Sequence, residues 1–377
     1  MKEITQFTPE ERLSNFMPTE KTKSQFSEGK SEPTLTKIAP LFDPSKPNIA
    51  KVFEPQSGLL FWDEHLEVYY QQYKKLTGQF WVPHEVSLQT DAKDWVHKMS
   101  DKQKELFKRA VSQLVLLDSI SSLIDGELAS HIKNAAIKTL MFYLGSQETI
   151  HNESYTYICT SFMSKEEAKS VFERPKTDPK VLEATMPILE AFEDYRMNPT
   201  PETAAYALLA MSCLEGVRFT NGFTPFYYLN RSNLMQGTGS VINLINRDET
   251  QHSYTQIAIA RNILTEYASV IDEGKVVNKV YDLFRKVVKA EQELSVSLYA
   301  DFDDIDIVEV QMYIEWRANM LLANMGLEKI FETKRNPMKW IAVFDPENNN
   351  NQKSDFFEKR LTNYTKTDNK KQKWDDL

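Results

Sequence analysis

The stretch ETIHNESY at residues 148–155 places a glutamate three residues before a histidine, and ETQH at residues 249–252 repeats that spacing. The chain has only 6 histidines among its 377 residues, so the repeat requires an explanation. Side chains three residues apart lie one turn apart on the same face of a helix. The in-phase positions just ahead of the two pairs are apolar, as Leu144 and Ile245 show. An unpaired buried carboxylate costs several kcal/mol, so a fold that buries two of them needs a compensating cation.

Two further acids interrupt apolar faces at helical spacing. Asp118 lies inside QLVLLDSIS, and Glu215 lies inside AMSCLEGVRF. The order along the chain is acid, Glu-x-x-His, acid, Glu-x-x-His, with 30 residues from Asp118 to Glu148 and 34 from Glu215 to Glu249. Each gap has the length of one helix plus a turn, so four helices would bring these residues together.

Ferritin-like di-metal carboxylate bundles use this ligand set, with one carboxylate from each of two helices and a Glu-x-x-His from each of the other two. Four carboxylates balance the charge of two divalent ions. Hard oxygen ligands with one imidazole per metal suit iron or manganese rather than thiophilic ions. The sequence therefore predicts an all-α, ferritin-like helical bundle with extra helices and a di-metal site in its core. We expect two iron ions per chain, or manganese in their place.

Two shorter matches to an acid–histidine spacing have simpler explanations. Asp94 precedes His97 in a polar connecting stretch, and Glu127 precedes His131 near a predicted helix end. Such matches occur by chance in an acidic chain, and neither is preceded by an acid on an apolar face one helix away. We therefore expect these four residues to be ordinary surface or capping groups.

The composition narrows the class of protein further. Glycine is scarce, with 11 residues, which favours helix. The net charge of −9 argues against general nucleic-acid binding, and the chain shows neither a signal peptide nor an apolar run of about 18 residues. Cys159 and Cys213 form no Cys-x-x-Cys motif and lie in apolar stretches, which predicts buried thiols. We expect a cytoplasmic protein with no nucleic-acid partner and no membrane association.

Three segments differ in character. Residues 1–55 are rich in Lys, Ser, Thr and Pro and predict an extended N-terminal arm, whereas residues 346–377 are polar and lysine-rich and predict a flexible C-terminal tail. Residues 56–345 predict one helical domain. Ser100 is the predicted N-cap of a long helix, and further helices are predicted at 133–161, 180–195, 201–230, 238–268, 273–300 and 305–332.

The motifs LLDSI, SQETIHNESY, LEGVRF and RDETQH, with FWVPHEV before them and NPMKW after them, resemble the radical-generating small subunit of class I ribonucleotide reductase. The resemblance covers most of residues 60–345, and none of the family's metal ligands is substituted. It implies that one metal is bound by Asp118, Glu148 and His151, and the other by Glu215, Glu249 and His252.

The resemblance also assigns a role to the tyrosine that ends the first motif. Tyr155 lies one helical turn after His151, and in the family the tyrosine at this position holds a stable radical. A phenol is hard to oxidise by one electron, so an oxidised metal pair must lie close, and the radical survives only where water and reductants are excluded. Phe219, Phe223 and Ile245 match the family's apolar pocket around this tyrosine.

The resemblance further implies a partner. The chain shows no GxGxxG motif and no P-loop, and in the family ribonucleotides are reduced on a separate large catalytic subunit. Trp81 and Asp248 match the family's exit route for the radical, and Tyr364 matches the relay tyrosine of the tail. The last residues, KWDDL, would dock on the large subunit, and the family's habit predicts a homodimer.

Leu144 departs from those family members that carry a tryptophan four residues before the first Glu-x-x-His glutamate. The electron supply during assembly of the metal centre is therefore expected to differ in detail. Two other classes remain open from the ligands alone. A di-iron oxygenase or desaturase needs a substrate cavity and has no use for Tyr155, and a non-catalytic iron-storage protein is usually much shorter. The choice between iron and manganese, the activation partner and the electron donor also stay open.

Overall fold

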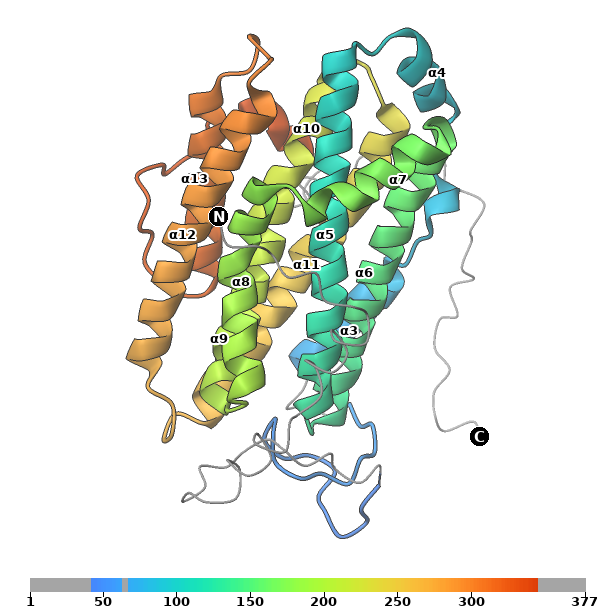
Figure 1. Ribbon diagram of the computed structural model, residues 1–377. Helices are drawn as coiled ribbons and strands as arrows, with labels where there is room; N and C mark the ends of the chain where they lie inside the picture. Colours follow the sequence, from blue (N-terminus) through green and yellow to red (C-terminus); the bar gives the residue numbers. More distant parts are fainter. Residues whose placement is uncertain (1–41, 63–66, 345–377) are drawn as a thin grey trace, which may run out of the picture.

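The computed structural model describes residues 42–62 and 67–344, and within these ranges it contains helices and no β-strand. The prediction of an all-α fold is therefore confirmed. Figure 1 shows long helices that run roughly parallel to one axis, with α7 lying across them. Four helical stretches form the central layer: α5 (Asp101–His131), α6 (Ala135–Phe162), α11 (Gln236–Glu266), and the continuous stretch of α9 (Pro201–Cys213) and α10 (Thr220–Arg231). In this layer α5 packs on α6, and α11 packs on α9 and α10.

The remaining helices cover this central layer. On one side, α8 and α12 pack on α9, and α12 packs on α13 in turn. On the other side, α3 and α4 pack on α6 and α11. Their bounds are α3 (Glu67–Gly78), α4 (Gln89–His97), α7 (Lys165–Glu173), α8 (Pro179–Met197), α12 (Glu273–Tyr299) and α13 (Ile307–Asn324).

Local sequence signals account for most helix ends. Ser100 caps α5 as predicted: its hydroxyl accepts from the Gln103 amide at 3.3 Å, and the Gln103 side chain accepts from the Ser100 amide at 2.9 Å. The C-terminus of α13 comes eight residues earlier than predicted. Gly326 takes a left-handed conformation with φ 81°, and the Leu327 amide donates to the Leu322 carbonyl at 2.8 Å, which together close the helix.

The single helix predicted at 201–230 is wrong in one respect. The chain is α-helical on both sides of Leu214–Phe219, but those residues form a π-helical turn between α9 and α10. We call these residues the π-segment. A π-turn carries one residue more per turn than an α-helix needs, and such turns are frequent at functional sites. The connecting stretch around residues 80–95 also contains a helix, α4, that was not predicted.

Both ends of α11 are held by distant parts of the chain. At its start, Asp91 of α4 accepts from the amides of Gly237 at 2.9 Å and Thr238 at 2.6 Å, and Asp94 accepts from the Met235 amide at 3.0 Å. At its other end, Glu266 accepts from the Val52 amide at 2.8 Å. Asp91 and Asp94 supply acceptors that the first amides of a helix otherwise lack, whereas Glu266 ties the last turn of α11 to the segment around Val52.

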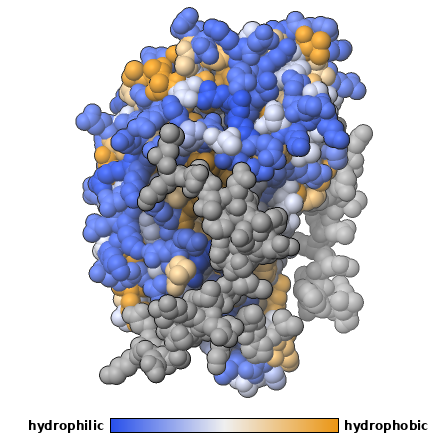
Figure 2. Space-filling view, in the orientation of Figure 1, coloured by the Kyte–Doolittle hydropathy of each residue, from blue (hydrophilic) through white to orange (hydrophobic). Residues whose placement is uncertain are grey.

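The described surface is mainly polar. Figure 2 shows the face seen in Figure 1, where apolar side chains gather at the upper left, over the upper ends of α12 and α13. No helix in the described ranges combines the length and apolar character needed to cross a membrane. The predicted arm at 1–55 is described only from residue 42 onward, and the predicted tail at 346–377, with Tyr364, lies outside the described residues.

Candidate metal centre

Six buried side chains from the central helices form two overlapping groups in the core. The ligand atoms of each group lie within 4.8 Å of one another, and both groups share Glu148 and Glu249. The elements that carry them are α5, α6, the π-segment and α11. The first group is Asp118, Glu148, His151 and Glu249, and the second is Glu148, Glu215, Glu249 and His252.

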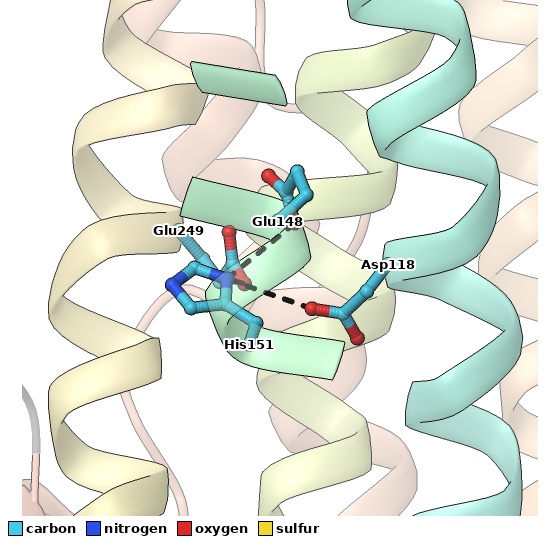
Figure 3. A group of neighbouring side chains, drawn as sticks. All are labelled: Asp118, Glu148, His151 and Glu249. Carbon is cyan, nitrogen blue, oxygen red and sulfur yellow. Dashed lines mark ion pairs between the residues drawn. The ribbon is translucent and has the colours of Figure 1, made fainter. Parts of the chain in front are cut away.

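The two shared glutamates each present one oxygen to each half of the centre. His151 Nδ1 lies 3.4 Å from Glu148 Oε2 and 2.9 Å from Glu249 Oε1. His252 Nδ1 lies 2.6 Å from Glu148 Oε1 and 2.9 Å from Glu249 Oε2. Asp118 Oδ1 completes the first half at 3.5 Å from His151 Nδ1. Figure 3 shows these acids turned toward His151 from α5, α6 and α11.

The short distances within the centre are not hydrogen bonds. Both Nδ1 atoms and all oxygens of Asp118, Glu148 and Glu249 are buried, and within the described part of the chain none has a partner in hydrogen-bond geometry. Nearly all buried polar atoms in proteins have such a partner. Ring nitrogens and carboxylate oxygens that converge without bonding one another fit the donor set of two hard divalent cations.

The pKa values of the buried groups also fit a metal site. Burial raises the pKa of Asp118 and Glu215 well above the usual carboxyl range, and the charge of Glu148 adds to the effect. Burial would lower the pKa of both histidines, but the Glu249 carboxylate raises that of His151, and Glu148 raises the pKa of His252 to about 10. Burial would likewise raise the pKa of Glu148, but the neighbouring His252 and His151 lower this pKa to about 2. Left to the protein groups alone, the centre holds protons that a divalent cation would have to displace.

Each histidine is oriented by a partner on its outer nitrogen. His151 Nε2 lies 3.4 Å from Asp248 Oδ2, and the same oxygen accepts from the indole of Trp81 at 2.7 Å. Although burial works against it, the contacts with His151 and Arg247 lower the pKa of Asp248. The outer nitrogen of His252 lies 3.3 Å from the amide oxygen of Gln147.

Comparison with known proteins shows the family. A sequence model described as "Ribonucleotide reductase, small chain" matches residues 64–337. The ribonucleoside-diphosphate reductase subunit beta of Halalkalibacterium halodurans is 32% identical over 314 residues, which are 82% of this chain and 90% of that protein. The chain belongs to the ribonucleotide reductase small-chain family. It is accordingly a beta subunit of an oxidoreductase, ribonucleoside-diphosphate reductase, and a beta subunit implies a large alpha subunit as its partner.

Solved structures of reductase small chains share the fold. A putative class I ribonucleotide reductase from Bacillus halodurans is 30% identical, with a TM-score of 0.70, and the match covers 74% of this chain and 99% of that one. The dimanganese(II)-NrdF of Streptococcus sanguinis is 24% identical, with a TM-score of 0.67, and the match covers 76% of this chain and 99% of that one.

Tyr155 of this reductase small chain is fully buried on α6, the helix of Glu148 and His151. Its hydroxyl has no partner in hydrogen-bond geometry among the described residues, and burial, together with the nearby Asp118 carboxylate, raises its pKa well above the usual phenol range. Trp81 is 4% exposed, and its ring stacks on His151 with centroids 6.1 Å apart. The expected pocket residues are all fully buried: Phe219, Phe223 and Ile245.

The two shorter sequence matches do not join any candidate metal group in the described ranges. Asp94 is a capping group, as expected, but it is buried under the start of α11 rather than on the surface. Glu127 pairs with Arg196 at 2.9 Å, and His131 contacts the Tyr195 hydroxyl.

Three polar residues of the reductase small chain's centre were not predicted. Gln147 orients His252, and Ser121 donates to Glu215 Oε1 at 3.1 Å. Asp125 is fully buried, one of its oxygens lacks a partner among the described residues, and its charge raises the pKa of Glu215. Ser121 and Asp125 follow Asp118 at spacings of three and seven, so the helical stripe that identified Asp118 could have identified them.

Proposed function

We propose that this small chain generates a stable radical on Tyr155 beside a two-metal centre, and that the large subunit uses the radical to reduce ribonucleotides to deoxyribonucleotides. The observation that carries the proposal is the pair of buried groups that share Glu148 and Glu249. Glu148 lies on α6, the helix that also carries the fully buried phenol of Tyr155. The reaction is inferred from the family, and the geometry of the centre supports its assignment to these residues.

The six residues would hold two iron ions, and Glu148 and Glu249 belong to both ligand groups. Manganese fits the same donors, and the structure of a relative from Streptococcus sanguinis is described as the dimanganese form. Bound ions, after reaction with oxygen, would supply the one-electron oxidant that a phenol requires. The protein's part is to exclude water: Tyr155, His151 and His252 are each fully buried.

The radical's exit is assigned to the contacts behind His151. Asp248 links His151 to Trp81 through a single carboxylate oxygen, and Arg247 holds the other oxygen at 3.0 Å. Phe80, next to Trp81, is 56% exposed, so this route ends near the surface. The tail at 346–377 would complete it, with Tyr364 as the relay and KWDDL as the docking segment for the large subunit.

The space around the centre disfavours an oxygenase. The cavity that touches Glu215 has a volume of about 20 Å³, which is room for a water molecule and not for an organic substrate. An iron-storage role has no use for the Trp81–Asp248–His151 contacts. We also propose that residues 56–345 form one domain and that the protein is cytoplasmic, and the free, buried thiols of Cys159 and Cys213 support the second proposal.

The test is activation of the full chain with ferrous iron and oxygen, followed by electron paramagnetic resonance. We expect a tyrosyl radical in the parent and none in Tyr155→Phe, with both proteins binding two iron ions. Tyr157→Phe is the matched control, because Tyr157 lies on the same helix and donates to the Val86 carbonyl at 2.9 Å. A full radical signal in Tyr155→Phe would overturn the assignment.

A further inference from the structure

Glu215 and Arg218 are three residues apart yet reach toward different helices. Glu215 accepts from Ser121 on α5 at 3.1 Å. Arg218 donates from Nε to Glu291 on α12 at 2.7 Å and from Nη1 to Thr185 on α8 at 2.7 Å. In a regular α-helix, side chains three residues apart share one face. Both residues lie in the π-segment, and its wider turn holds them on different faces.

The ion pair between Arg218 and Glu291 is completely buried, with both side chains 0% exposed. The second oxygen of Glu291 accepts from Asn221 at 2.7 Å. Arg218 belongs to the π-segment and Asn221 to α10, so one carboxylate on α12 holds both sides of the junction between them.

The side of the π-segment that faces α13 is closely packed as well. A Cβ at Gly216 would lie 2.9 Å from a methyl group of Leu321 on α13. The Gly216 carbonyl accepts from the Thr220 hydroxyl at 3.0 Å and from Arg317 at 3.4 Å. The π-turn is thus supported on the side facing α13, while Arg218 holds it on the side facing α8 and α12.

We propose that the buried Arg218–Glu291 pair is a positioning device for Glu215, which keeps the π-segment in the register that turns this carboxylate into the second half of the metal centre. If the segment relaxed to a regular α-helix, Glu215 and Arg218 would share one face, and the helices before and after it would rotate relative to one another by about 100°. Glu215 would then leave the centre, or the Arg218 guanidinium would leave Glu291. A buried charge without its partner is strongly unfavourable, so the ion pair couples the helix register to the direction of Glu215.

The inference rests on the proposed metal centre and adds a residue that touches neither metal nor substrate. A purely structural role would predict a less stable protein with an unchanged centre. A positioning role predicts a centre whose second half is impaired, while the first half, with Asp118 and His151, still binds its ion.

The experiment is a titration of the metal-free full chain with Mn(II), followed by electron paramagnetic resonance and by thermal unfolding. The parent should bind two Mn(II) ions that are magnetically coupled. Arg218→Met should weaken binding of the second ion at least tenfold and yield the six-line signal of an isolated Mn(II). Arg218→Lys should recover part of the coupled signal, because an ammonium group can still pair with Glu291.

Arg109→Met is the matched control. Arg109 lies on α5 and, like Arg218, donates to α12, where the Ser297 carbonyl accepts at 2.7 Å. This change should lower the unfolding temperature and leave the coupled pair intact. Should Arg218→Met not fold, Glu291→Gln carries the same test, since it keeps the shape and removes the charge. A coupled pair of parental affinity in these variants would overturn the inference. A parent that binds no coupled pair would overturn the proposed centre itself.

Discussion

At the scale of single residues, the two histidines of the centre differ in what holds their outer nitrogens. His151 faces the carboxylate of Asp248, whereas His252 faces the neutral amide of Gln147. Each partner accepts a hydrogen bond from Nε2–H, which fixes the tautomer whose Nδ1 lone pair can bind a metal in the centre. A carboxylate partner makes an imidazole the more basic ligand, so the two halves of the centre are chemically unequal.

Replacing Gln147 by leucine should impair one half of the centre. His252 would lose the acceptor for its outer N–H, and loss of such a partner typically lowers metal affinity about 10- to 100-fold. Calorimetric titration with Mn(II) should show one weakened site and one site of parental affinity. Gln147→Glu, which retains an acceptor, should bind both ions. Equal weakening of both sites would contradict the assignment of Gln147 to His252.

Metal loading should release protons at neutral pH. The pKa of His252 is raised to about 10, so this imidazole holds a proton at neutral pH until a cation displaces it. The raised pKa values of His151, Asp118 and Glu215 act in the same direction. Affinity should therefore fall as the pH falls. Calorimetry in buffers of different ionisation enthalpy measures the released protons. Titration with sodium chloride in place of the divalent metal is the control. Binding without proton release, at an affinity independent of pH, would contradict this picture.

The ligands could be predicted from sequence because each interrupts an apolar helical stripe, as Glu148 and Glu249 do. Their outer partners could not. Gln147 stands next to Glu148 in the chain, but its importance depends on His252, which is 105 residues away and reaches it only across the bundle. Trp81 and Asp248 were identified from the family resemblance alone, because neither residue belongs to a pattern of its own, and their contact is seen only in the structure.

Among the helices, the regular spacing of apolar residues predicted the long ones, but it did not predict the π-segment or the short helix α4. The π-segment LEGVRF has the composition of an ordinary helix, and its extra residue per turn becomes evident only when Glu215 and Arg218 are seen to contact different neighbours. The capping of α11 by Asp91 was equally hidden, since 146 residues separate it from Gly237.

Gly239→Ala should disturb the junction of α10 and α11. A Cβ at Gly239 would overlap the side-chain amide of Asn230, which donates to the carbonyls of Leu234 and Met235 at 3.0 and 2.9 Å. Overpacking of this kind costs about 1–3 kcal/mol. Gly126→Ala on α5 is the control: its Cβ would meet nothing within 4 Å, and alanine favours helix by up to about 1 kcal/mol. Chemical denaturation measures both, and a Gly239→Ala protein of parental stability would contradict the close packing.

At the scale of the whole molecule, the predicted homodimer needs an apolar surface to bury. Leu123 on α5 is 73% exposed and Phe142 on α6 is 52% exposed. The two helices touch closely between these residues, where a Cβ at Gly145 would lie 3.4 Å from the Ser122 carbonyl. Exposed large apolar groups on adjoining helices are typical of a protein–protein contact, so we expect the homodimer predicted from the sequence to form through this face.

If the predicted homodimer forms through this face, a double change of Leu123→Glu and Phe142→Glu should yield a monomer, because it places like charges where two copies would meet. Sedimentation velocity at micromolar concentration measures the change. Met197→Glu is the control, since Met197 on α8 is 69% exposed and should leave the dimer intact. A double variant that still sediments as a dimer would place the interface elsewhere.

The anchoring of α11 at both ends bears on how long a bound ion stays. Glu249 and His252 lie in the middle of this helix, and helices commonly open from their ends. Asp91 and Asp94 hold one end, and the Glu266 carboxylate binds the Val52 amide at the other. For α11 to open as far as its ligands, one of these anchors must be released first. Residence of the ions would then be governed by the rate of that opening, and a chelator alone would strip them far more slowly than a chelator with a mild denaturant.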